Sequence, residues 1–219
     1  MKTIRWRKLD ADHVSRYTFH ERAIHLIVAV TCVYLVLSGL ALVTPFLFWM
    51  SSLLGGPAPM RLFHPILGLL YFIFLVYMWW MWRRDLHLNQ ADKGWMDHMS
   101  AYVTNHDEGL PAIDRWNAGQ KIFFWMMMFS GIGLIVSGLV LWFPEYVAWN
   151  LQWIKFLAII LHAACAFVSI GGLMIHIYMG VFFVKGGFRQ IVTGEVSREW
   201  ASHHHRLWLE RVTKERADG

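Results

Sequence analysis

Residues 154–184 read IKFLAIILHAACAFVSIGGLMIHIYMGVFFV, an apolar run whose single Lys or Arg, Lys155, stands at its first edge. A helix needs about 20 apolar residues to cross the hydrocarbon core of a bilayer, and this run is longer than that. It contains two histidines, His162 and His176. An ionisable side chain inside a membrane is costly and is usually retained for a function. The run therefore predicts a membrane-spanning helix that carries a functional site.

Three more apolar runs, at 24–48, 65–82 and 122–143, complete the pattern, and none of the four contains Asp or Glu. Hydrophobic residues make up 57% of the 219-residue chain and charged residues 16%, which suits a core that lies in lipid. Thr18 and Glu21 are spaced as a capping box ahead of the first run. We predict an all-α membrane protein of one domain, a four-transmembrane-helix bundle over residues 1–219. Its spans are expected at about 20–48, 60–82, 120–143 and 153–184, followed by a tail at 185–219.

The basic residues predict the orientation of the helices, because segments on the cytoplasmic side of a membrane carry an excess of Lys and Arg. The connections after the first and third runs offer only Arg61 and Lys155. The other segments are rich in basic residues: Lys2, Arg5, Arg7, Lys8, Arg16, Arg22, Arg83, Arg84, Lys93, Arg115, Lys121, Lys185, Arg189 and Arg198. Both termini are therefore expected in the cytoplasm. The net charge of +5 is then explained by topology and lipid headgroups rather than by nucleic-acid binding.

Four of the twelve histidines lie in the apolar runs or at their ends, and their depths define two pairs. His25 lies near the cytoplasmic end of the first run, and His64 lies near the outer end of the second. His162 and His176 are fourteen residues apart, which is about 21 Å and nearly four turns of a helix, so they share one face. We expect His64 to meet His162 near the outer side, and His25 to meet His176 near the cytoplasmic side. Two imidazoles on facing helices are a common way to hold a b-type haem.

Other functions of these histidines stay open at this point. A single intramembrane histidine can serve helix packing. Structural zinc needs four ligands around one point, usually including Cys or carboxylate groups, and Cys32 and Cys165 form no C-x-x-C motif. Ion or proton transporters usually carry Asp or Glu within the membrane and have interrupted helices. A haem-free anchor or transporter is the alternative from a different class of protein.

A weak internal repeat links the first and third runs. Leu37-Ser38-Gly39-Leu40 resembles Val136-Ser137-Gly138-Leu139, and a histidine follows each glycine at a similar distance. The repeat suggests that the two helix pairs descend from one hairpin. Glycines in the runs leave room for a flat macrocycle or allow helices to pack closely, and the sequence does not separate these two interpretations. They are Gly39, Gly68, Gly131, Gly133, Gly138, Gly171 and Gly172.

Several short strings, by their order and spacing, carry a resemblance to a known family. They are Glu21-Arg22-Ala23-Ile24-His25, Arg61-Leu62-Phe63-His64-Pro65, Asn117-Ala118-Gly119-Gln120-Lys121, Leu161-His162-Ala163-Ala164 and Ile175-His176-Ile177-Tyr178-Met179. Over residues 16–208 the chain resembles the cytochrome b (gamma) subunit of membrane-bound respiratory formate dehydrogenases. The resemblance implies two haem b groups, the outer one ligated by His64 and His162 and the cytoplasmic one by His25 and His176. It also implies a menaquinone site lined by Asn117, Gly119 and Gln120.

The resemblance further implies a role within a complex of the bacterial inner membrane. The chain would pass electrons from a periplasmic iron–sulfur (beta) subunit through the haems to menaquinone at the cytoplasmic side. A molybdenum or tungsten catalytic (alpha) subunit would carry the formate chemistry. Related cytochromes serve hydrogenases and thiosulfate or other sulfur-compound reductases, and these are the alternative partners.

The chain departs from the family pattern at Leu26, at Phe143-Pro144 and in the tail string His203-His204-His205-Arg206-Leu207-Trp208. None of these departures touches a proposed ligand, but they leave the physiological partner open. The His203–His205 run is expected to be a solvated tract beside a helix, with metal binding as the alternative.

Overall fold

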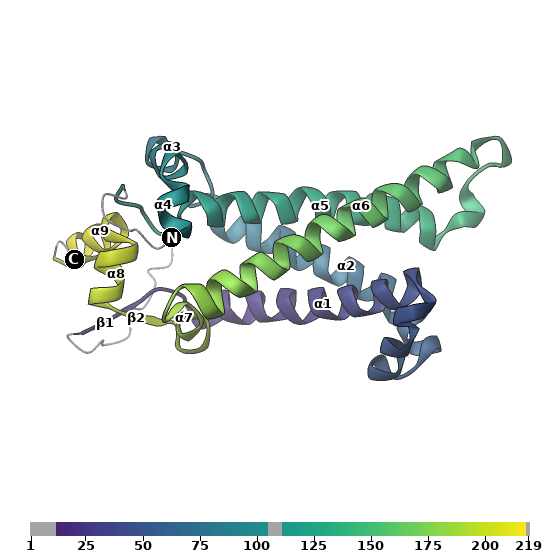
Figure 1. Cartoon of the computed structure of the whole chain (residues 1–219), viewed down its shortest axis with the longest axis horizontal. Coiled ribbons are helices and arrows are strands. Elements are labelled where there is room, and N and C mark those ends of the chain that lie inside the picture. The colour runs from purple at the N-terminus through teal and green to yellow at the C-terminus, as the bar shows by residue number, and fades with distance from the viewer. Residues whose placement is uncertain (1–11, 105–110, 218–219) are drawn as a thin grey trace. The chain divides into compact units, whose positions relative to one another are not determined.

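The computed structural model describes residues 12–104 and 111–217, and helices dominate it (Figure 1). Within these described residues, four helices are long and apolar enough to cross a membrane. They are α1 (Phe19–Val43), α2 (Pro57–Trp82), α5 (Ala118–Trp142) and α6 (Trp153–Ile177), the last continued by the π-helix η4 (Tyr178–Phe183). The prediction of four membrane-spanning helices is confirmed. The basic residues Lys2, Arg5, Arg7 and Lys8 lie outside the described residues, and the cytoplasmic location of the termini stays a prediction.

The chain folds as two compact units. The first, called the bundle unit here, comprises Ala23–Met81 and Trp125–His176 and so holds most of the four long helices. The second, called the tail unit, comprises residues 12–22, 82–104, 111–124 and 177–217 of the described chain. All four intramembrane histidines belong to the bundle unit.

The first span ends at Val43, before the predicted 48, because Pro45 interrupts it. Proline has no amide hydrogen for the helix ladder, and it disfavours the helical conformation in the residue before it. Thr44 is accordingly extended, at φ −142° and ψ 133°, and its side chain caps the 3-10 helix η1 (Pro45–Leu54). Gly55 ends η1 at φ 84°, a left-handed conformation that glycine adopts without strain.

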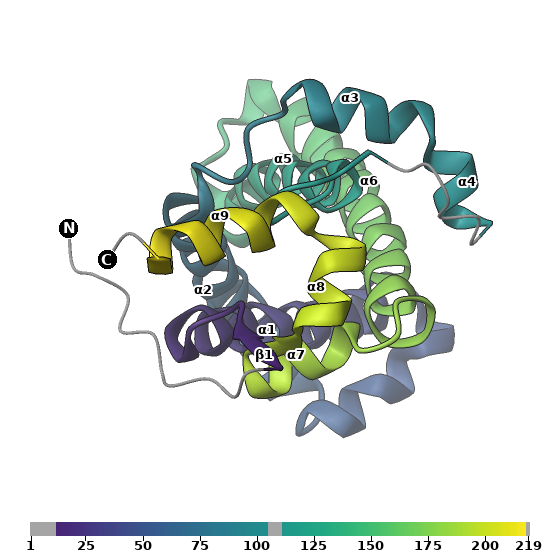
Figure 2. The same ribbon diagram turned by 90° about the vertical axis from the view of Figure 1, so that its left-hand side faces the viewer.

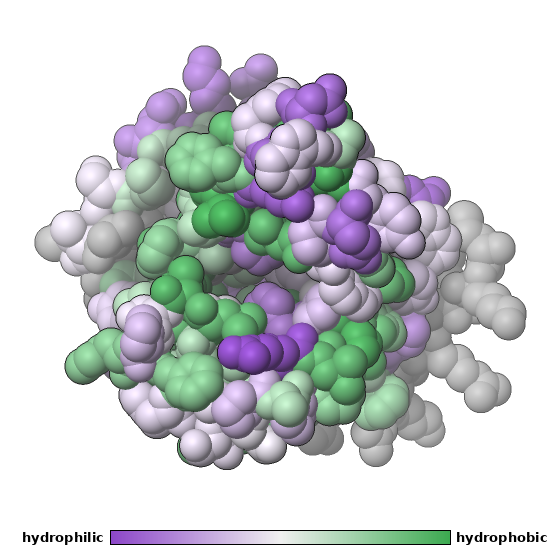
Figure 3. All heavy atoms as spheres, turned by 90° about the vertical axis from the view of Figure 1, so that its right-hand side faces the viewer, coloured by the Kyte–Doolittle hydropathy of each residue, from purple (hydrophilic) through white to green (hydrophobic). Residues whose placement is uncertain are grey.

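The third span ends at Trp142, as Pro144 predicts, and two 3-10 turns lead into α6: η2 (Pro144–Tyr146) and η3 (Trp149–Leu151). Large apolar side chains are exposed along the connections from α1 to α2 and from α5 to α6, including Phe46 at 85% and Trp149 at 89%. Figure 3 shows an end of the molecule where apolar side chains are exposed among hydrophilic ones. Such exposure suits a surface that meets lipid or another protein rather than water.

The tail unit contains a two-stranded sheet that the all-α prediction missed; both strands are labelled in Figure 1, and β1 is labelled again in Figure 2. β1 (His13–Ser15) pairs antiparallel with β2 (Glu195–Ser197), and Val14 lies opposite Val196. Strands of three residues are too short for a period of two to be recognised in the sequence. The sheet joins the segment before α1 to the segment after α6, and both valines enter one small core. That core contains Val14, Val196, Ala201, Trp208 and Val212.

The short helices of the tail unit are α3 (Gln90–Asp97), α4 (Met99–Val103), α7 (Gly187–Thr193), α8 (Arg198–His204) and α9 (Arg206–Ala217). Gly194 ends α7 at φ 83°, and a Cβ there would lie 2.6 Å from the carbonyl oxygen of Tyr17. Only glycine allows this approach, which sets the chain direction into β2.

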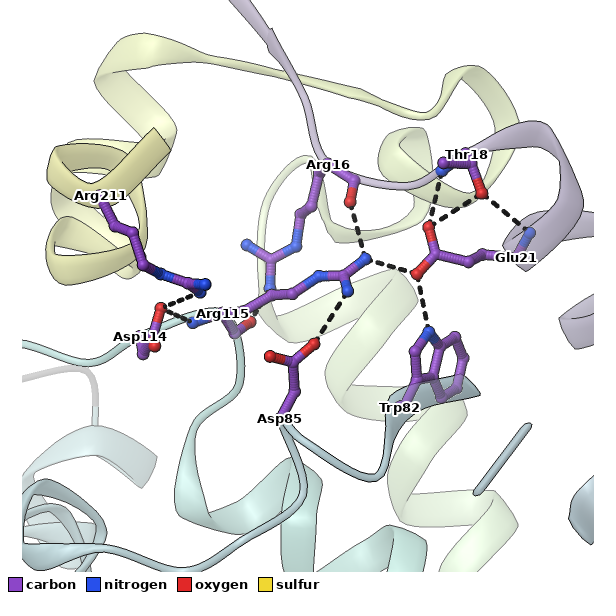
Figure 4. A network of polar contacts seen from close by, with 8 residues as sticks. All are labelled: Arg16, Thr18, Glu21, Trp82, Asp85, Asp114, Arg115 and Arg211. Carbon is purple, nitrogen blue, oxygen red and sulfur yellow. Dashed lines mark hydrogen bonds and ion pairs between the residues drawn. The ribbon is translucent and has the colours of Figure 1, made fainter. Parts of the chain in front are cut away.

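Figure 4 shows a polar cluster that joins the start of α1, the end of α2 and the segment before α5. The predicted capping box is present, since Thr18 N donates to Glu21 Oε2 at 2.8 Å and Glu21 N donates to Thr18 Oγ1 at 3.2 Å. Glu21 Oε1 also accepts bonds from Trp82 Nε1 at 2.8 Å and from Arg115 at 2.6 Å. Arg115 donates to Asp85 at 2.9 Å as well. Burial would lower the pKa of Arg115, but Glu21 and Asp85 raise it overall, so the guanidinium stays charged.

Candidate functional site: two pairs of facing histidines

The bundle unit brings the four intramembrane histidines together as two pairs. His64 on α2 faces His162 on α6, with ring centroids 6.4 Å apart and planes at 58°. His25 on α1 faces His176 on α6, with ring centroids 6.1 Å apart and planes at 51°. These are the two pairs that helix depth predicts. One helix, α6, therefore contributes to both, at positions about 21 Å apart along its axis.

The ring separations leave room for one metal ion within each pair. If each ring nitrogen lies about 2.0–2.1 Å from a shared metal, and half a ring is added on each side, the centroids fall roughly 6 Å apart. The observed separations agree with this estimate. Two imidazoles on opposite sides of one iron are the axial ligand set of a low-spin haem. The residues present therefore fit haem b in both pairs.

Each ring of the His64/His162 pair, called the outer pair here after its predicted location, is hydrogen-bonded to a serine of a neighbouring helix. Ser38 Oγ on α1 lies 2.6 Å from His64 Nδ1, and Ser137 Oγ on α5 lies 3.0 Å from His162 Nδ1. Both serines are buried, at 0% and 2% exposed. With Nδ1 engaged, the Nε2 atom of each ring is the one that can bind a metal.

The glycine that follows each serine lies against the same histidine. A Cβ at Gly39 would lie 3.5 Å from His64 Cε1, and one at Gly138 would lie 3.3 Å from His162 Cε1. The Ser-Gly repeat therefore marks the same set of contacts in both hairpins. In each hairpin, the first helix places a serine hydroxyl and a glycine against the histidine of the second helix. Gly131 serves close helix packing instead, since a Cβ there would lie 3.0 Å from Leu75.

The inner pair has different surroundings. α6 changes from α to π geometry at Tyr178, two residues after His176. Short π-helical segments are rare and are frequent at functional sites. His176 is exposed on the bundle, whereas His25 is half-buried.

The candidate quinone residues lie at the start of α5, within the tail unit. Asn117 and Gln120 form a reciprocal capping box, with Gln120 N donating to Asn117 Oδ1 at 2.8 Å and Asn117 N donating to Gln120 Oε1 at 3.0 Å. These bonds use both side-chain oxygens and leave the NH2 group of each amide as a donor. Gly119 admits the indole of Trp95, which would lie 3.1 Å from a Cβ there.

Next to this segment is a buried ion pair that the sequence did not predict. Lys121 Nζ lies 2.7 Å from Asp92 Oδ2 and 3.0 Å from the carbonyl oxygen of His87. Both side chains are almost fully buried, at 4% and 3% exposed. Asp92 also completes the capping box of α3 with Asn89. The pair fixes α3 against the start of α5 and so holds Trp95 beside Gly119.

The histidines of the run His203–His205 differ in how far they are buried. His203 is exposed, as predicted, but the prediction of a solvated side chain is wrong for His205, which is 3% exposed. His205 Nδ1 lies 2.7 Å from the carbonyl oxygen of Asp114, an acceptor, so the ring donates this hydrogen bond. Burial lowers the pKa of His205 well below its ordinary value of 6.5, and the nearby charge of Arg16 adds to the effect. His205 is thus a neutral packing residue.

Facing histidines between apolar helices are the arrangement expected of a b-type cytochrome of the membrane. Comparison with known families agrees with this class. The model of the prokaryotic cytochrome b561 family matches residues 16–194, and the chain belongs to this family. Because a cytochrome b carries haem b, family membership implies haem b as a cofactor.

Curated relatives extend over most of the chain. The cytochrome b556(fdo) subunit of formate dehydrogenase from Escherichia coli K12 is 33% identical over 205 residues, covering 93% of this chain and 95% of that protein. The cytochrome b556(Fdn) subunit of the nitrate-inducible formate dehydrogenase from the same strain is 30% identical over 207 residues, covering 93% and 94%. The formate dehydrogenase cytochrome b556 subunit of Haemophilus influenzae is 28% identical over 204 residues, covering 92% and 85%. The resemblance to formate dehydrogenase cytochrome b subunits is confirmed.

Proposed function

We propose that this chain is the dihaem b membrane subunit of a formate dehydrogenase complex. In this proposal it passes electrons from a periplasmic iron–sulfur subunit to menaquinone at the cytoplasmic side of the bacterial inner membrane. Residues 1–219 act as one membrane-embedded cytochrome b domain with both termini in the cytoplasm. The names of the relatives support the complex, and the basic segments flanking the spans support the orientation.

The observation that carries the proposal is the use of α6 by both histidine pairs. His162 and His176 each face a histidine of another helix, and their separation of about 21 Å is a large part of the roughly 30 Å hydrocarbon core. Haem b held at each position would supply one-electron redox chemistry on either side of the membrane centre. His64 and His162 are the ligands of the outer site, and His25 and His176 are those of the inner site.

Menaquinone is proposed to bind at the start of α5. The capping box fixes the directions of the Asn117 and Gln120 side chains, so their NH2 groups can donate to a quinone carbonyl without further ordering. Gly119 keeps the backbone between them free of a side chain. A position at the end of a span also gives access to protons from the aqueous side.

The partners are proposed to be an iron–sulfur (beta) subunit and a molybdenum or tungsten catalytic (alpha) subunit. In this proposal the formate chemistry takes place on the catalytic subunit and not on this chain. Its role is to connect the catalytic subunits to the quinone pool.

The test is to isolate the affinity-tagged chain from native membranes under mild detergent and to add formate without oxygen. We expect co-purified iron–sulfur and molybdenum or tungsten subunits, together with formate-driven reduction of b haem and of a menaquinone analogue. Reduction by hydrogen but not by formate would identify a hydrogenase partner instead. A complex without b-haem absorbance would contradict the proposal and favour a haem-free anchor or transporter.

A further inference from the structure

Two buried serines occupy matching positions around the outer histidine pair. Ser38 lies on the helix that precedes the one carrying His64, and Ser137 lies on the helix that precedes the one carrying His162. Both are followed by a glycine that touches the same ring. The two sides of the pair are therefore built alike, although they come from different hairpins.

The direction of each hydrogen bond follows from a count of protons. Ser38 Oγ lies 2.7 Å from the carbonyl oxygen of Tyr34, and Ser137 Oγ lies 2.6 Å from that of Gly133. A carbonyl oxygen can only accept, and a serine has one O–H hydrogen, so each hydroxyl donates to its own helix. The lone pair left on each Oγ must then accept from the histidine Nδ1–H.

This direction fixes the state of both rings. Each histidine is a neutral imidazole with its proton on Nδ1, and its Nε2 lone pair is directed away from the serine. A neutral imidazole with a free Nε2 is the form that binds haem iron. A ring turned over would place a C–H against the serine oxygen and lose the bond, so the hydroxyl also sets the orientation of the ring.

We propose that Ser38 and Ser137 are positioning residues that lock the outer histidines in their iron-binding form and lower the reduction potential of the haem they hold. The inference rests on the proposed function. Donation from Nδ1–H to an oxygen increases the basicity of Nε2, and a more basic ligand favours ferric over ferrous iron. Both axial ligands of one site receive this support, so their effects add.

A serine whose hydroxyl contacts a carbonyl of its own helix and another serine, but no histidine, gives a matched control. Ser169 Oγ, on α6, also contacts a carbonyl one turn back, that of Cys165, at 2.9 Å. Its other contact, at 2.9 Å, is Ser130 Oγ rather than a histidine. Replacement of Ser169 removes a buried hydroxyl from the same bundle without touching a proposed ligand.

The experiment is a redox titration of the purified complex, followed by haem absorbance and by the low-spin EPR signals, which report the orientation of the axial imidazoles. Ser38→Ala and Ser137→Ala should each raise the midpoint potential of one haem and leave the other unchanged, and the double variant should shift the same haem further. Ser38→Thr, which keeps a hydroxyl, should restore the original potential and signal. Ser169→Ala should change neither haem.

Three results would overturn the inference: no shift in the alanine variants, equal shifts of both haems, or the same shift in Ser169→Ala. Loss of one haem from Ser38→Ala with recovery in Ser38→Thr supports positioning, and equal loss of both haems contradicts it. The haem content of the unsubstituted complex distinguishes failure of this inference from failure of the proposed function. If that complex lacks two b haems, the proposed function has failed, whereas unchanged potentials in a two-haem complex reject only the role of the serines.

Discussion

The outer and inner histidine pairs have nearly equal ring separations, 6.4 Å and 6.1 Å, and unlike surroundings. The outer rings are each bonded to a buried serine within a long α-helix. The inner pair lies where α6 enters a π-helix and where α1 begins, one turn after the polar cluster around Glu21. Similar ring spacing shows that both sites suit the same kind of ligand. Because the residues around the two pairs differ, we predict that the haems they hold differ in reduction potential and that different substitutions affect each site.

The largest effect is expected from removing one histidine of a pair. His64→Ala or His162→Ala should remove about half of the haem, and His25→Ala or His176→Ala should remove the other half, because in the proposed function each pair would ligate one haem. Haem content by pyridine haemochrome, with reduced-minus-oxidised spectra, measures this. Loss of both haems, or of neither, in a folded variant would contradict the pairing.

A smaller effect is expected at the proposed quinone site, with both haems retained. Asn117→Asp and Gln120→Glu keep the oxygens of the capping box but replace the NH2 donors, so the helix start should survive. Loss of a hydrogen bond to the quinone should lower quinone reduction by about tenfold. The measurement is electron transfer from the prereduced complex to a menaquinone analogue. Asn89→Asp, in the capping box of α3, is the matched control, and full activity in the α5 variants would reject the site.

The polar cluster offers a way to disturb the inner pair alone. Arg115→Ala leaves Glu21 and Asp85 without their cation, and loss of one partner of a largely buried ion pair costs about 3 kcal/mol. Glu21 lies one turn before His25 on α1, so loosening this helix start should lower haem occupancy at the inner site first.

Haem content and thermal denaturation measure the effect of Arg115→Ala. Arg211→Ala is the control, because its ion pair with Asp114 is 46% and 42% exposed and should contribute less than about 1 kcal/mol. Equal loss of both haems in Arg115→Ala would show that the cluster stabilises the whole fold rather than the inner site.

The smallest effect is expected for the pH dependence of the stability of the tail unit around His205. The pKa of His205 is lowered in the folded chain, so below about pH 6.5 the unfolded tail binds a proton that the folded tail does not. The stabilisation is complete above that pH and falls as the pH is lowered. The protection factors of amides in α8 and α9, which are exchange rates corrected for the intrinsic effect of pH, should therefore fall from pH 7.5 to 5.5, and His205→Gln should reduce this dependence. The outer haem should keep its spectrum over the same range.

The spans and the two pairs could be predicted because they depend on strong local signals. An apolar run fixes a spanning helix, and a rise of 1.5 Å per residue then fixes the depth of each histidine. The capping box at Thr18 and Glu21 was equally local, and the structure contains it. The family resemblance added the candidate quinone segment, whose local structure is a second capping box.

What the sequence did not predict depends on contacts between distant segments. The short sheet forms because residues 13–15 meet residues 195–197, and three residues carry no readable pattern. His205 is buried by a segment ninety-one positions away, at Asp114. Ser38 and Ser137 were visible as a repeat, but their contacts to the histidines appear only when the helices are packed. Pro45 indicates in the sequence that α1 ends early. The prediction placed the end too late because it used only the length of the apolar run.

The measurement that tests the two-site proposal most directly is the number of haem b groups per chain in the purified complex. Pyridine haemochrome analysis against protein content should give two, with two resolved midpoint potentials in a redox titration. One haem per chain would show that one histidine pair binds none. No haem, in protein produced with haem available, would contradict the electron-transfer function proposed for this chain.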